Sequence, residues 1–415
     1  MERFDLFFNL YIDPGTGSML FAVIIGIAST LFFLAQKFWI KLKFIFSSGR
    51  VKDDGNAKKK PLVIFGEDGR YWNIFHSVCD ELESRGIECE YYTMDKNDPS
   101  LSSGYTHIHP SFIGEGNKAF AKLNMLKANV LFTTTPGLDV YQWKRSPNVD
   151  KYLHIYHAVD EGAGYRMFGM DFFDSILMSS QFQADTIRSL EKMRKEAPKD
   201  IEIVGSPYLD DLARKAKTYE RPARDKDDKV VLLAPSWGES SILSKFGDEM
   251  LEALVKTGYH IIIRPHPQSK IVEKEILDKL IEKYPESEQI EWDNNNDGFP
   301  SLSRADIMIS DFSSVVFDFA LIFDKPVIFA DTDFDKSPYD AAWFDEDLWR
   351  LRVLDQMGVS LKKEDFPNMK DLIRDLTEND RFQAGRDKLR DQLWAERGES
   401  AKNIADYLES QLKAG

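Results

Sequence analysis

The sequence predicts an α/β protein made of two similar halves that face a common cleft. Short apolar runs of strand length alternate with segments of helical period, and this alternation occurs twice. A charged stretch with a proline, residues 218–228, separates the two series and is interpreted as a domain junction. Hydrophobic residues make up 43% of the 415 residues and charged residues 30%, as in ordinary globular proteins.

The first half begins at residue 61, after a polar linker. Its first strand is the buried run of residues 62–66, and residues 73–85 follow with apolar side chains in helical spacing and Gly86 as the C-cap. Further strands are expected at residues 88–94, 130–133, 152–156, 176–178 and 201–204. This succession, with helical segments between the strands, indicates a mostly parallel, doubly wound sheet.

The second half repeats the pattern. Its strands are expected at residues 230–234, 260–263, 290–292, 307–309 and 327–330. Two long, charged and amphipathic helices, residues 369–376 and 382–412, end the chain. We expect them to pack across the outside of both halves.

The N-terminus is much more apolar than the rest of the chain. Residues 14–36 form an uncharged segment. The segment is long enough for a membrane-spanning helix, which we expect at about residues 17–40. Lysines follow from Lys37 onward, so the positive-inside rule places the later chain in the cytoplasm. We therefore expect a single-pass membrane anchor in residues 1–46 and a linker in residues 47–60. A cleaved signal peptide is the alternative, but a basic leading cluster and a small-residue cleavage site are missing.

Charge and cysteine content exclude several classes of function. The net charge of −15 argues against nucleic-acid binding, because phosphate backbones require a cationic face. Cys79 and Cys89 cannot form a thiolate zinc cluster. His107 and His109 form an H-x-H pair without a nearby third ligand, so a loop with satisfied side chains is favoured over a metal site. We expect neither a metal nor a cofactor.

Two strands of the second half end abruptly in groups that bind phosphate. Arg264 and His266 follow one strand, with His266 between two prolines, and together they provide a cationic seat for a diphosphate. Asp311, Ser313 and Ser314 follow another strand and precede a helical segment whose N-terminus can bind phosphate. The structural alternatives are an ordinary turn and ordinary N-capping.

A strand of the first half also ends in a histidine. His157 is a candidate general base, because its ordinary pKa lies near neutrality, and Asp160 or Glu161 would orient it on the acceptor side. His154 is interpreted as a core or sheet-face residue.

Taken in order, these segments resemble the CDP-glycerol glycerophosphotransferase family, which includes the polyol-phosphate primases and polymerases of teichoic acid synthesis. The resemblance covers roughly residues 152–333 and lies in the segments around His157, residues 203–210, residues 232–237 with Ser236, residues 264–267, residues 310–318 and residues 325–329.

The resemblance implies a GT-B-like fold of two Rossmann-type domains, an acceptor domain in residues 61–217 and a nucleotide-donor domain in residues 218–415. It implies transfer of a polyol phosphate, foremost glycerol phosphate, from a CDP-alcohol to a hydroxyl of a lipid-linked acceptor at the membrane. His157 would be the acid/base and His266 the partner of the donor diphosphate. Ser313, Ser314 and Ser236 would lie on the donor side.

The chain also departs from the family pattern. His157 is followed by Ala158, Val159 and Asp160 where the family usually has Gly, Thr and then a lysine, and residues 236–238 read Ser-Trp-Gly instead of Thr-Trp-Arg. These differences leave open a different polyol, a different acceptor or a loss of activity. The alternatives are therefore a GT-B sugar transferase or nucleotide-sugar 2-epimerase, and a catalytically silent membrane-anchored scaffold.

Overall fold

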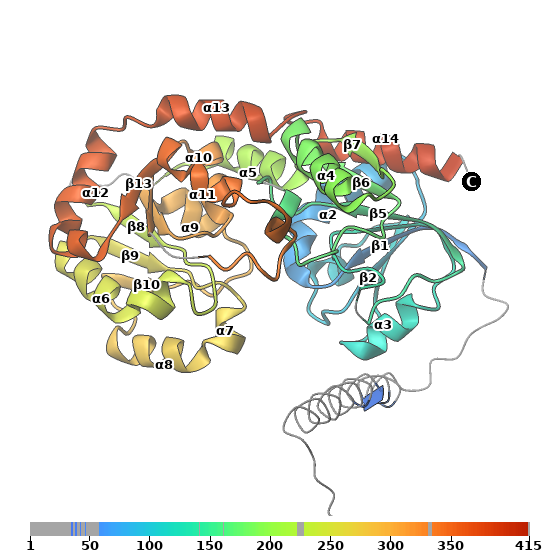
Figure 1. Cartoon of the computed structure of the whole chain (residues 1–415), viewed down its shortest axis with the longest axis horizontal. Helices are drawn as coiled ribbons and strands as arrows, with labels where there is room; N and C mark the ends of the chain where they lie inside the picture. The colour runs from blue at the N-terminus through green and yellow to red at the C-terminus, as the bar shows by residue number, and fades with distance from the viewer. Residues whose placement is uncertain are drawn as a thin grey trace, which may run out of the picture.

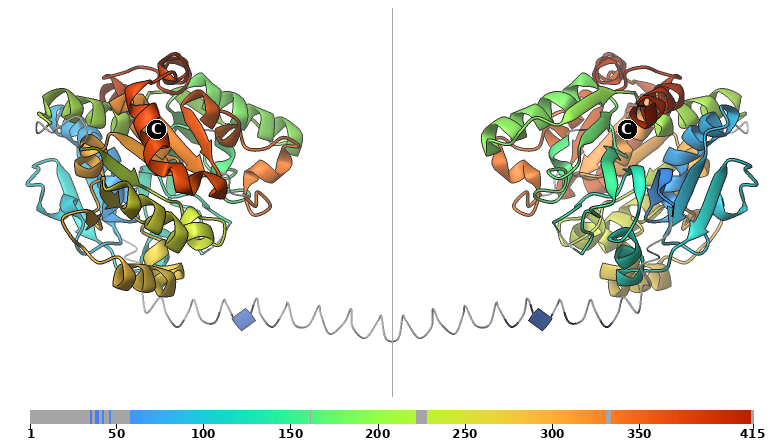
Figure 2. Two further views of the ribbon diagram at one scale, coloured as in Figure 1. Left: turned by 90° about the vertical axis from the view of Figure 1, so that its left-hand side faces the viewer. Right: turned by 90° about the vertical axis from the view of Figure 1, so that its right-hand side faces the viewer.

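The computed structural model describes residues 58–413, apart from Tyr141, Glu161, residues 222–227 and residues 331–333, together with five residues between positions 35 and 46. From residue 58 onward the chain forms two α/β halves side by side, each with a central sheet between layers of helices (Figure 1, Figure 2). The expected pair of α/β halves is confirmed.

The first half contains a seven-stranded sheet in the order β3-β2-β1-β4-β5-β6-β7, and all its strand pairs are parallel. Its strands are β1 (Lys60–Gly66), β2 (Cys89–Thr93), β3 (Ile108–Phe112), β4 (Ala128–Thr133), β5 (Val149–Ile155), β6 (Ser175–Met178) and β7 (Asp200–Ile203). Its helices are α2 (Trp72–Ser84), α3 (Asn117–Leu123), α4 (Gln181–Arg194) and α5 (Pro207–Thr218).

The second half contains a six-stranded sheet in the order β10-β9-β8-β11-β12-β13, again with parallel pairs. Its strands are β8 (Val230–Leu233), β9 (His260–Ile263), β10 (Ile290–Trp292), β11 (Ile307–Ser310), β12 (Val327–Ala330) and β13 (Gly358–Leu361). The helices that follow α5 are α6 (Ile242–Thr257), α7 (Ser269–Val272), α8 (Lys274–Lys283), α9 (Phe299–Arg304), α10 (Val315–Phe323), α11 (Trp349–Arg352), α12 (Met369–Glu378), α13 (Gln383–Leu393) and α14 (Ser400–Lys413).

Both sheets are buried on their two faces, which explains why their central strands are apolar throughout. In β1, Val63 and Phe65 pack in one core cluster while Leu62 and Ile64 pack in another. Successive side chains of a strand point to opposite faces, so a strand covered on both sides must be continuously apolar. The continuous apolar runs in the sequence were the basis for predicting buried parallel strands.

The chain crosses between the halves after β12 and again after α13. Helix α14 returns to the first half, where Ile404, Ala405 and Leu408 join the same core cluster as Leu62. In Figure 1, α13 and α14 run along one side of both halves. The segment after β12 also reaches the first half, where Met167 donates a hydrogen bond from its amide to the Pro338 carbonyl, 3.0 Å away.

Two edge strands were missed, and one predicted helix is wrong. Strand β3 contains Pro110 and is largely exposed, and β13 is only four residues long, so neither has the apolar pattern of a buried strand. The single helix expected at residues 382–412 is instead divided into α13 and α14. The break contains Glu396 and Gly398, whose φ angles of 51° and 85° are incompatible with a continuing right-handed helix.

The predicted membrane anchor in residues 1–46 and the linker up to residue 57 lie outside the described residues, except for Ala35, Phe38, Trp39, Leu42 and Phe46, which are helical. Among the residues that the structure describes, no helix combines the length and the apolar character needed to cross a membrane.

We predict that Leu408→Ala lowers the free energy of unfolding by about 2–5 kcal/mol, because it leaves a cavity in the core of the first half. Leu408 is fully buried, whereas Lys402 on the same helix keeps 59% of its side chain exposed. Urea unfolding of Leu408→Ala and of the control Lys402→Ala measures the difference. A loss below about 1 kcal/mol for Leu408→Ala would contradict the packing of α14 into this core.

Candidate functional site

Each sheet has a switch point, where the chain turns from one side of the sheet to the other. The first sheet grows from β1 to β2 and β3 before the chain returns to β4, and the second grows from β8 to β9 and β10 before it returns to β11. The loops beyond such a point diverge and leave a crevice at the carboxyl ends of the strands. Arg70 lies in the loop after β1, and Ser236 and Trp237 lie in the loop after β8.

Two pockets open at these switch points and meet between the halves. The first, here called the Arg70 pocket, has a volume of about 390 Å³, and the second, the Trp237 pocket, has about 430 Å³. The Arg70 pocket is lined equally from both halves, and the Trp237 pocket is lined mainly from the second. His266, Ser313 and Ser314 line both, so the predicted phosphate-binding residues lie where the two pockets join.

His266 is held at this junction by the rigid turn after β9. Its Nδ1 accepts a hydrogen bond from the backbone amide of Gln268, 3.1 Å away, so the neutral imidazole carries its proton on Nε2. The Trp237 ring lies 6.2 Å from the imidazole, centroid to centroid. Burial and the positive charge of Arg70 lower the pKa of His266 to about 4. A neutral Nε2–H group is a suitable donor for a phosphate oxygen.

His157 follows β5 and faces the Arg70 pocket from the first half. The hydroxyl of Tyr165 lies 2.8 Å from its Nδ1, and the Tyr71 ring lies 5.5 Å from the imidazole. Burial and the positive charges of Arg70 and Arg350 lower the pKa of His157 to about 4. The ring is therefore neutral at pH 7, as a general base must be before it accepts a proton.

Ser313 and Ser314 stand immediately before α10, at the end of the helix that faces the pockets. The first amides of a helix have no acceptor within it, so this end can bind an anion. Ser236 lines the Trp237 pocket as well. These three predicted donor-side residues lie together.

Asp311 has a different place from the one its motif suggested. It is fully buried and lines neither pocket. Its carboxylate accepts backbone hydrogen bonds from Ser236 at 2.8 Å, Ile242 at 2.9 Å and Ser313 at 3.3 Å. Asp311 is thus placed to position the loops that were predicted to bind phosphate, and it does not itself line either pocket.

Arg264 is also turned away from the pockets. One Nη group lies 2.5 Å from a carboxylate oxygen of Asp293, and the other donates to the Asn296 carbonyl at 3.3 Å. The ion pair neutralises the charge that was expected to bind a diphosphate. Arg264 lines neither pocket, so the cation of this site comes from elsewhere.

Asp160 is buried and pairs across the halves with Arg350, whose Nε lies 3.2 Å from its carboxylate. Arg350 itself lines the Trp237 pocket. Glu161, the other acid expected on the acceptor side, lies outside the described residues. The structure therefore brings Asp160 to the contact between the halves instead of to the Arg70 pocket.

Sequence reasoning missed Arg70 and Arg350. Arg70 lies in the 3-10 helix Gly69–Tyr71, directly after β1, and lines the Arg70 pocket. The available signal was its position after the first strand of a doubly wound half, where ligands bind. Arg350 lies in a short helix far along the chain and reaches the first half only through the fold, so no local pattern marked it.

Within the described residues, no group of three or more His, Cys, Asp or Glu side chains is arranged to hold a metal ion. His107 and His109 both contact Glu88, at 2.9 and 2.8 Å, in agreement with their interpretation as satisfied side chains.

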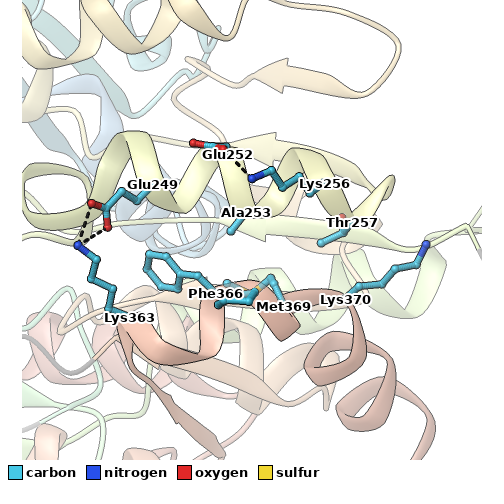
Figure 3. Close-up of a pocket in the computed structure, with 10 residues that line it drawn as sticks. Glu249, Glu252, Ala253, Lys256, Thr257, Lys363, Phe366, Met369 and Lys370 are labelled. Carbon is cyan, nitrogen blue, oxygen red and sulfur yellow. Dashed lines mark hydrogen bonds and ion pairs between the residues drawn. The ribbon is translucent and has the colours of Figure 1, made fainter.

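A third pocket, of about 340 Å³, lies away from the switch points, between α6 and the segment around Phe366 (Figure 3). Lys363 pairs with Glu249 at 2.8 Å and Lys256 with Glu252 at 2.6 Å. The remaining lysine of the pocket, Lys370, lies 5.5 Å from the centroid of the Tyr259 ring.

Part of the chain matches a known protein family. Residues 167–345 match the model of the family described as CDP-glycerol:poly(glycerophosphate) glycerophosphotransferase. This segment of the chain is similar to that family. The resemblance noted in the sequence is confirmed, and the matched segment includes His266, Ser313 and Ser314 but ends before Arg350.

Among curated proteins, the chain is similar to the teichoic acid glycerol-phosphate primase of Bacillus spizizenii. The two are 27% identical over 173 residues, which cover 38% of this chain. The match spans only 40% of the primase.

Solved structures share the fold of this chain over most of its length. The wall teichoic acid polymerase TagF superposes with a TM-score of 0.57 and 17% identity, covering 94% of this chain and 98% of the polymerase chain. A putative UDP-N-acetylglucosamine 2-epimerase from Listeria monocytogenes superposes with a TM-score of 0.55 and 13% identity, covering 86% and 98%. The fold is thus GT-B-like.

We predict that the imidazoles of His157 and His266 both titrate near pH 4 and that Arg70→Gln raises both pKa values. Removing the guanidinium removes a positive charge that disfavours protonation of each ring. NMR titration of histidine-labelled protein measures this, with Arg374→Gln, on the exposed face of α12, as the control. Ordinary titration near pH 6.5 in the unaltered protein would contradict the buried, cation-flanked site.

Proposed function

We propose that this protein transfers a polyol phosphate, foremost glycerol phosphate, from a CDP-activated alcohol to a hydroxyl of a membrane-associated acceptor. One observation carries the proposal: the Arg70 pocket and the Trp237 pocket join at His266, Ser313 and Ser314. A transferase needs a donor and an acceptor that meet at the group being transferred. A diphosphate at this junction would lie between a nucleotide in one pocket and an acceptor in the other.

Similarity to known proteins supports the choice of donor. The matched family is named for transfer of glycerol phosphate from CDP-glycerol, and one structure of the polymerase TagF was obtained after a soak with CDPG. The Trp237 pocket is the natural place for the nucleotide, because it lies at the switch point of the second sheet.

The reaction would be a single in-line displacement. The acceptor oxygen attacks the β-phosphorus of the CDP-alcohol, a new P–O bond forms, and the P–O bond to CMP breaks. His157 takes the proton of the acceptor hydroxyl, and CMP leaves with the electron pair of the broken bond. His266 and the N-terminus of α10 stabilise the negative charge on the phosphates.

The low pKa of His157 is a property of the site without its anionic donor. A bound diphosphate brings negative charge close to His266 and offsets the charge of Arg70. The pKa of both imidazoles then rises toward neutrality. Donor binding would thus convert a weak base into one better suited to accept a proton at pH 7.

A lipid-linked acceptor at the cytoplasmic face of the membrane is consistent with the N-terminal sequence and with the primase relative. In addition, Phe38, Trp39 and Phe46 are at least 66% exposed in the described part of the N-terminal segment. Exposed aromatic side chains among lysines favour a membrane interface.

Two other functions are distinguishable by experiment. A nucleotide-sugar 2-epimerase is favoured by one observation, the fold match to the Listeria protein, which is almost as good as the match to TagF. A catalytically silent scaffold is favoured by the departures after His157 and at residues 236–238. The family match at residues 167–345 favours the transferase over both.

We predict that the full-length protein in membranes releases CMP from CDP-glycerol or CDP-ribitol and does not turn over UDP-N-acetylglucosamine. His157→Ala should lower CMP release by about 10²- to 10⁴-fold, the usual contribution of a general base. His266→Ala should lower it by about 10²- to 10³-fold, the usual effect of removing one donor to a developing negative charge. His107→Ala is the matched control, because His107 is 36% exposed and paired with Glu88.

Several results would contradict this function. Full CMP release by His266→Ala would remove the assigned role of the junction. Epimerisation of UDP-N-acetylglucosamine would favour the first alternative, and a lack of turnover with every CDP-alcohol would favour the scaffold.

A further inference from the structure

The Trp237 pocket needs a positive charge if it is to hold the donor diphosphate. Arg264, the arginine expected there, is held in an ion pair away from both pockets. Among the described residues that line the Trp237 pocket, Glu239 and Asp335 are acids, and Arg350 is the only arginine or lysine. A diphosphate bound in this pocket would therefore have Arg350 as its cationic neighbour in the pocket wall.

Arg350 is carried by a segment that belongs to the second half in sequence but packs on the first. Leu348, directly before α11, joins the core cluster of the first half. Asp340, earlier in the segment, accepts a hydrogen bond from the Phe168 amide at 2.7 Å and forms a buried ion pair with Arg194. These contacts hold α11, the helix of Arg350, against the first half.

Asp160 and Gly164 determine where the guanidinium of Arg350 lies. The carboxylate of Asp160 is 3.2 Å from the Nε of Arg350. The Nη2 atom lies against Gly164, which also lines the Trp237 pocket, and a Cβ atom at this glycine would stand only 2.0 Å from that nitrogen. The backbone of Gly164 does not adopt a positive φ, so a glycine is needed here for space and not for backbone conformation.

The ion pair of Arg350 differs in its consequence from that of Arg264. The pair with Asp293 places Arg264 outside both pockets, whereas Arg350 pairs with Asp160 and still lines the Trp237 pocket. The charge of Arg350 also extends to His157, whose pKa it helps to lower. A guanidinium in a pocket wall suits a phosphate, because its planar fork matches two phosphate oxygens.

We propose that Arg350 binds the α-phosphate of the CDP-alcohol and stabilises the charge that remains on CMP when it leaves. This inference rests on the proposed transferase function and adds a binding residue to its donor site. In the displacement, the electron pair of the broken P–O bond stays on an oxygen of the CMP phosphate, next to the guanidinium. Arg350 thereby takes the role that the sequence position suggested for Arg264.

Calorimetry with CDP tests this contact without requiring turnover. In full-length protein in detergent micelles, we expect Arg350→Gln to lower the affinity for CDP by about 10- to 100-fold, the usual effect of losing a charge-assisted hydrogen bond. Cytidine, which has no phosphate, should bind both proteins equally. Arg352→Gln is the matched control and should leave the CDP affinity unchanged, because Arg352 lies on the same helix, is 48% exposed and does not line the Trp237 pocket.

A substitution at Gly164 tests the geometry with the arginine still present. Gly164→Ala should displace the guanidinium, because the new Cβ would overlap Nη2 of Arg350, and should lower the affinity for CDP. In the Arg350→Gln background the same substitution should have no further effect, because both changes act on one contact. An unchanged CDP affinity in Gly164→Ala would contradict the assigned position of the guanidinium.

A double variant separates phosphate binding from the contact between the halves. Arg350→Gln alone leaves the buried carboxyl of Asp160 without this partner, which is destabilising. Asp160→Asn combined with Arg350→Gln removes both charges, so it should recover the melting temperature but not the affinity for CDP. If the double variant also recovers the CDP affinity, Arg350 acts only on the contact between the halves and the inference is wrong.

The outcomes for this inference and for the proposed function are distinguishable. If CDP-glycerol is turned over and Arg350→Gln binds CDP as tightly as the unaltered protein, the inference is wrong and the function stands. If Arg350→Gln raises only the KM for the acceptor, Arg350 serves the acceptor and the inference is again wrong. If no CDP-alcohol is turned over but CDP binds in an Arg350-dependent manner, the function fails and the nucleotide site stands.

Discussion

Asp311 has no exposed surface, yet its carboxylate accepts hydrogen bonds from the backbone of Ser236, Ile242 and Ser313. These three amides belong to the loop after β8, the start of α6 and the turn before α10. A buried carboxylate needs such donors, and burial still raises the pKa of Asp311 to about 6, so the group is ionised at neutral pH. The bonds hold the walls of the Trp237 pocket and the phosphate-binding end of α10 in one arrangement. The carboxylate thus adds a side-chain link to the direct pairing of β8 with β11 beneath the junction of the two pockets.

The charges at the junction are arranged for an anionic ligand. His157 and His266 are both neutral at pH 7, because burial and Arg70 disfavour their protonation. This leaves the site with a fixed cation, a helix N-terminus and two neutral imidazoles, whose basicity would rise if an anion bound nearby.

The sequence predicted the buried strands correctly, because their positions depend on burial. It did not predict the features that depend on tertiary contacts. The apolar runs of β1, β8, β9 and β11 must be covered on both faces, so their positions could be read directly from composition. Strands β3 and β13 lie at sheet edges, where a strand need not be apolar on both faces. His157 and His266 could be found because each ends a strand, and the carboxyl ends of parallel strands meet in space.

The roles of the charged residues were harder to predict, because they depend on which partner the fold supplies. Arg264 and Asp311 stand in the right motifs, but Asp293 neutralises the first and three backbone amides occupy the second. Arg70 gives no motif and still provides the cation of its pocket. A charge pattern in sequence thus indicates that a site exists, while the ion pairs of the fold decide which member meets the ligand.

The same reasoning bears on the departures from the family pattern after His157. Val159 is 3% exposed and packs in the core cluster of the second half, and Asp160 pairs with Arg350 of that half. The side-chain amide of Gln183 donates to the carbonyls of Ala158 and Asp160, both at 2.8 Å. These residues therefore form a contact between the halves, where an acid is compensated by an arginine. His157 itself lines the Arg70 pocket, so the residues that follow it serve the contact between the halves while the proposed base faces the pocket.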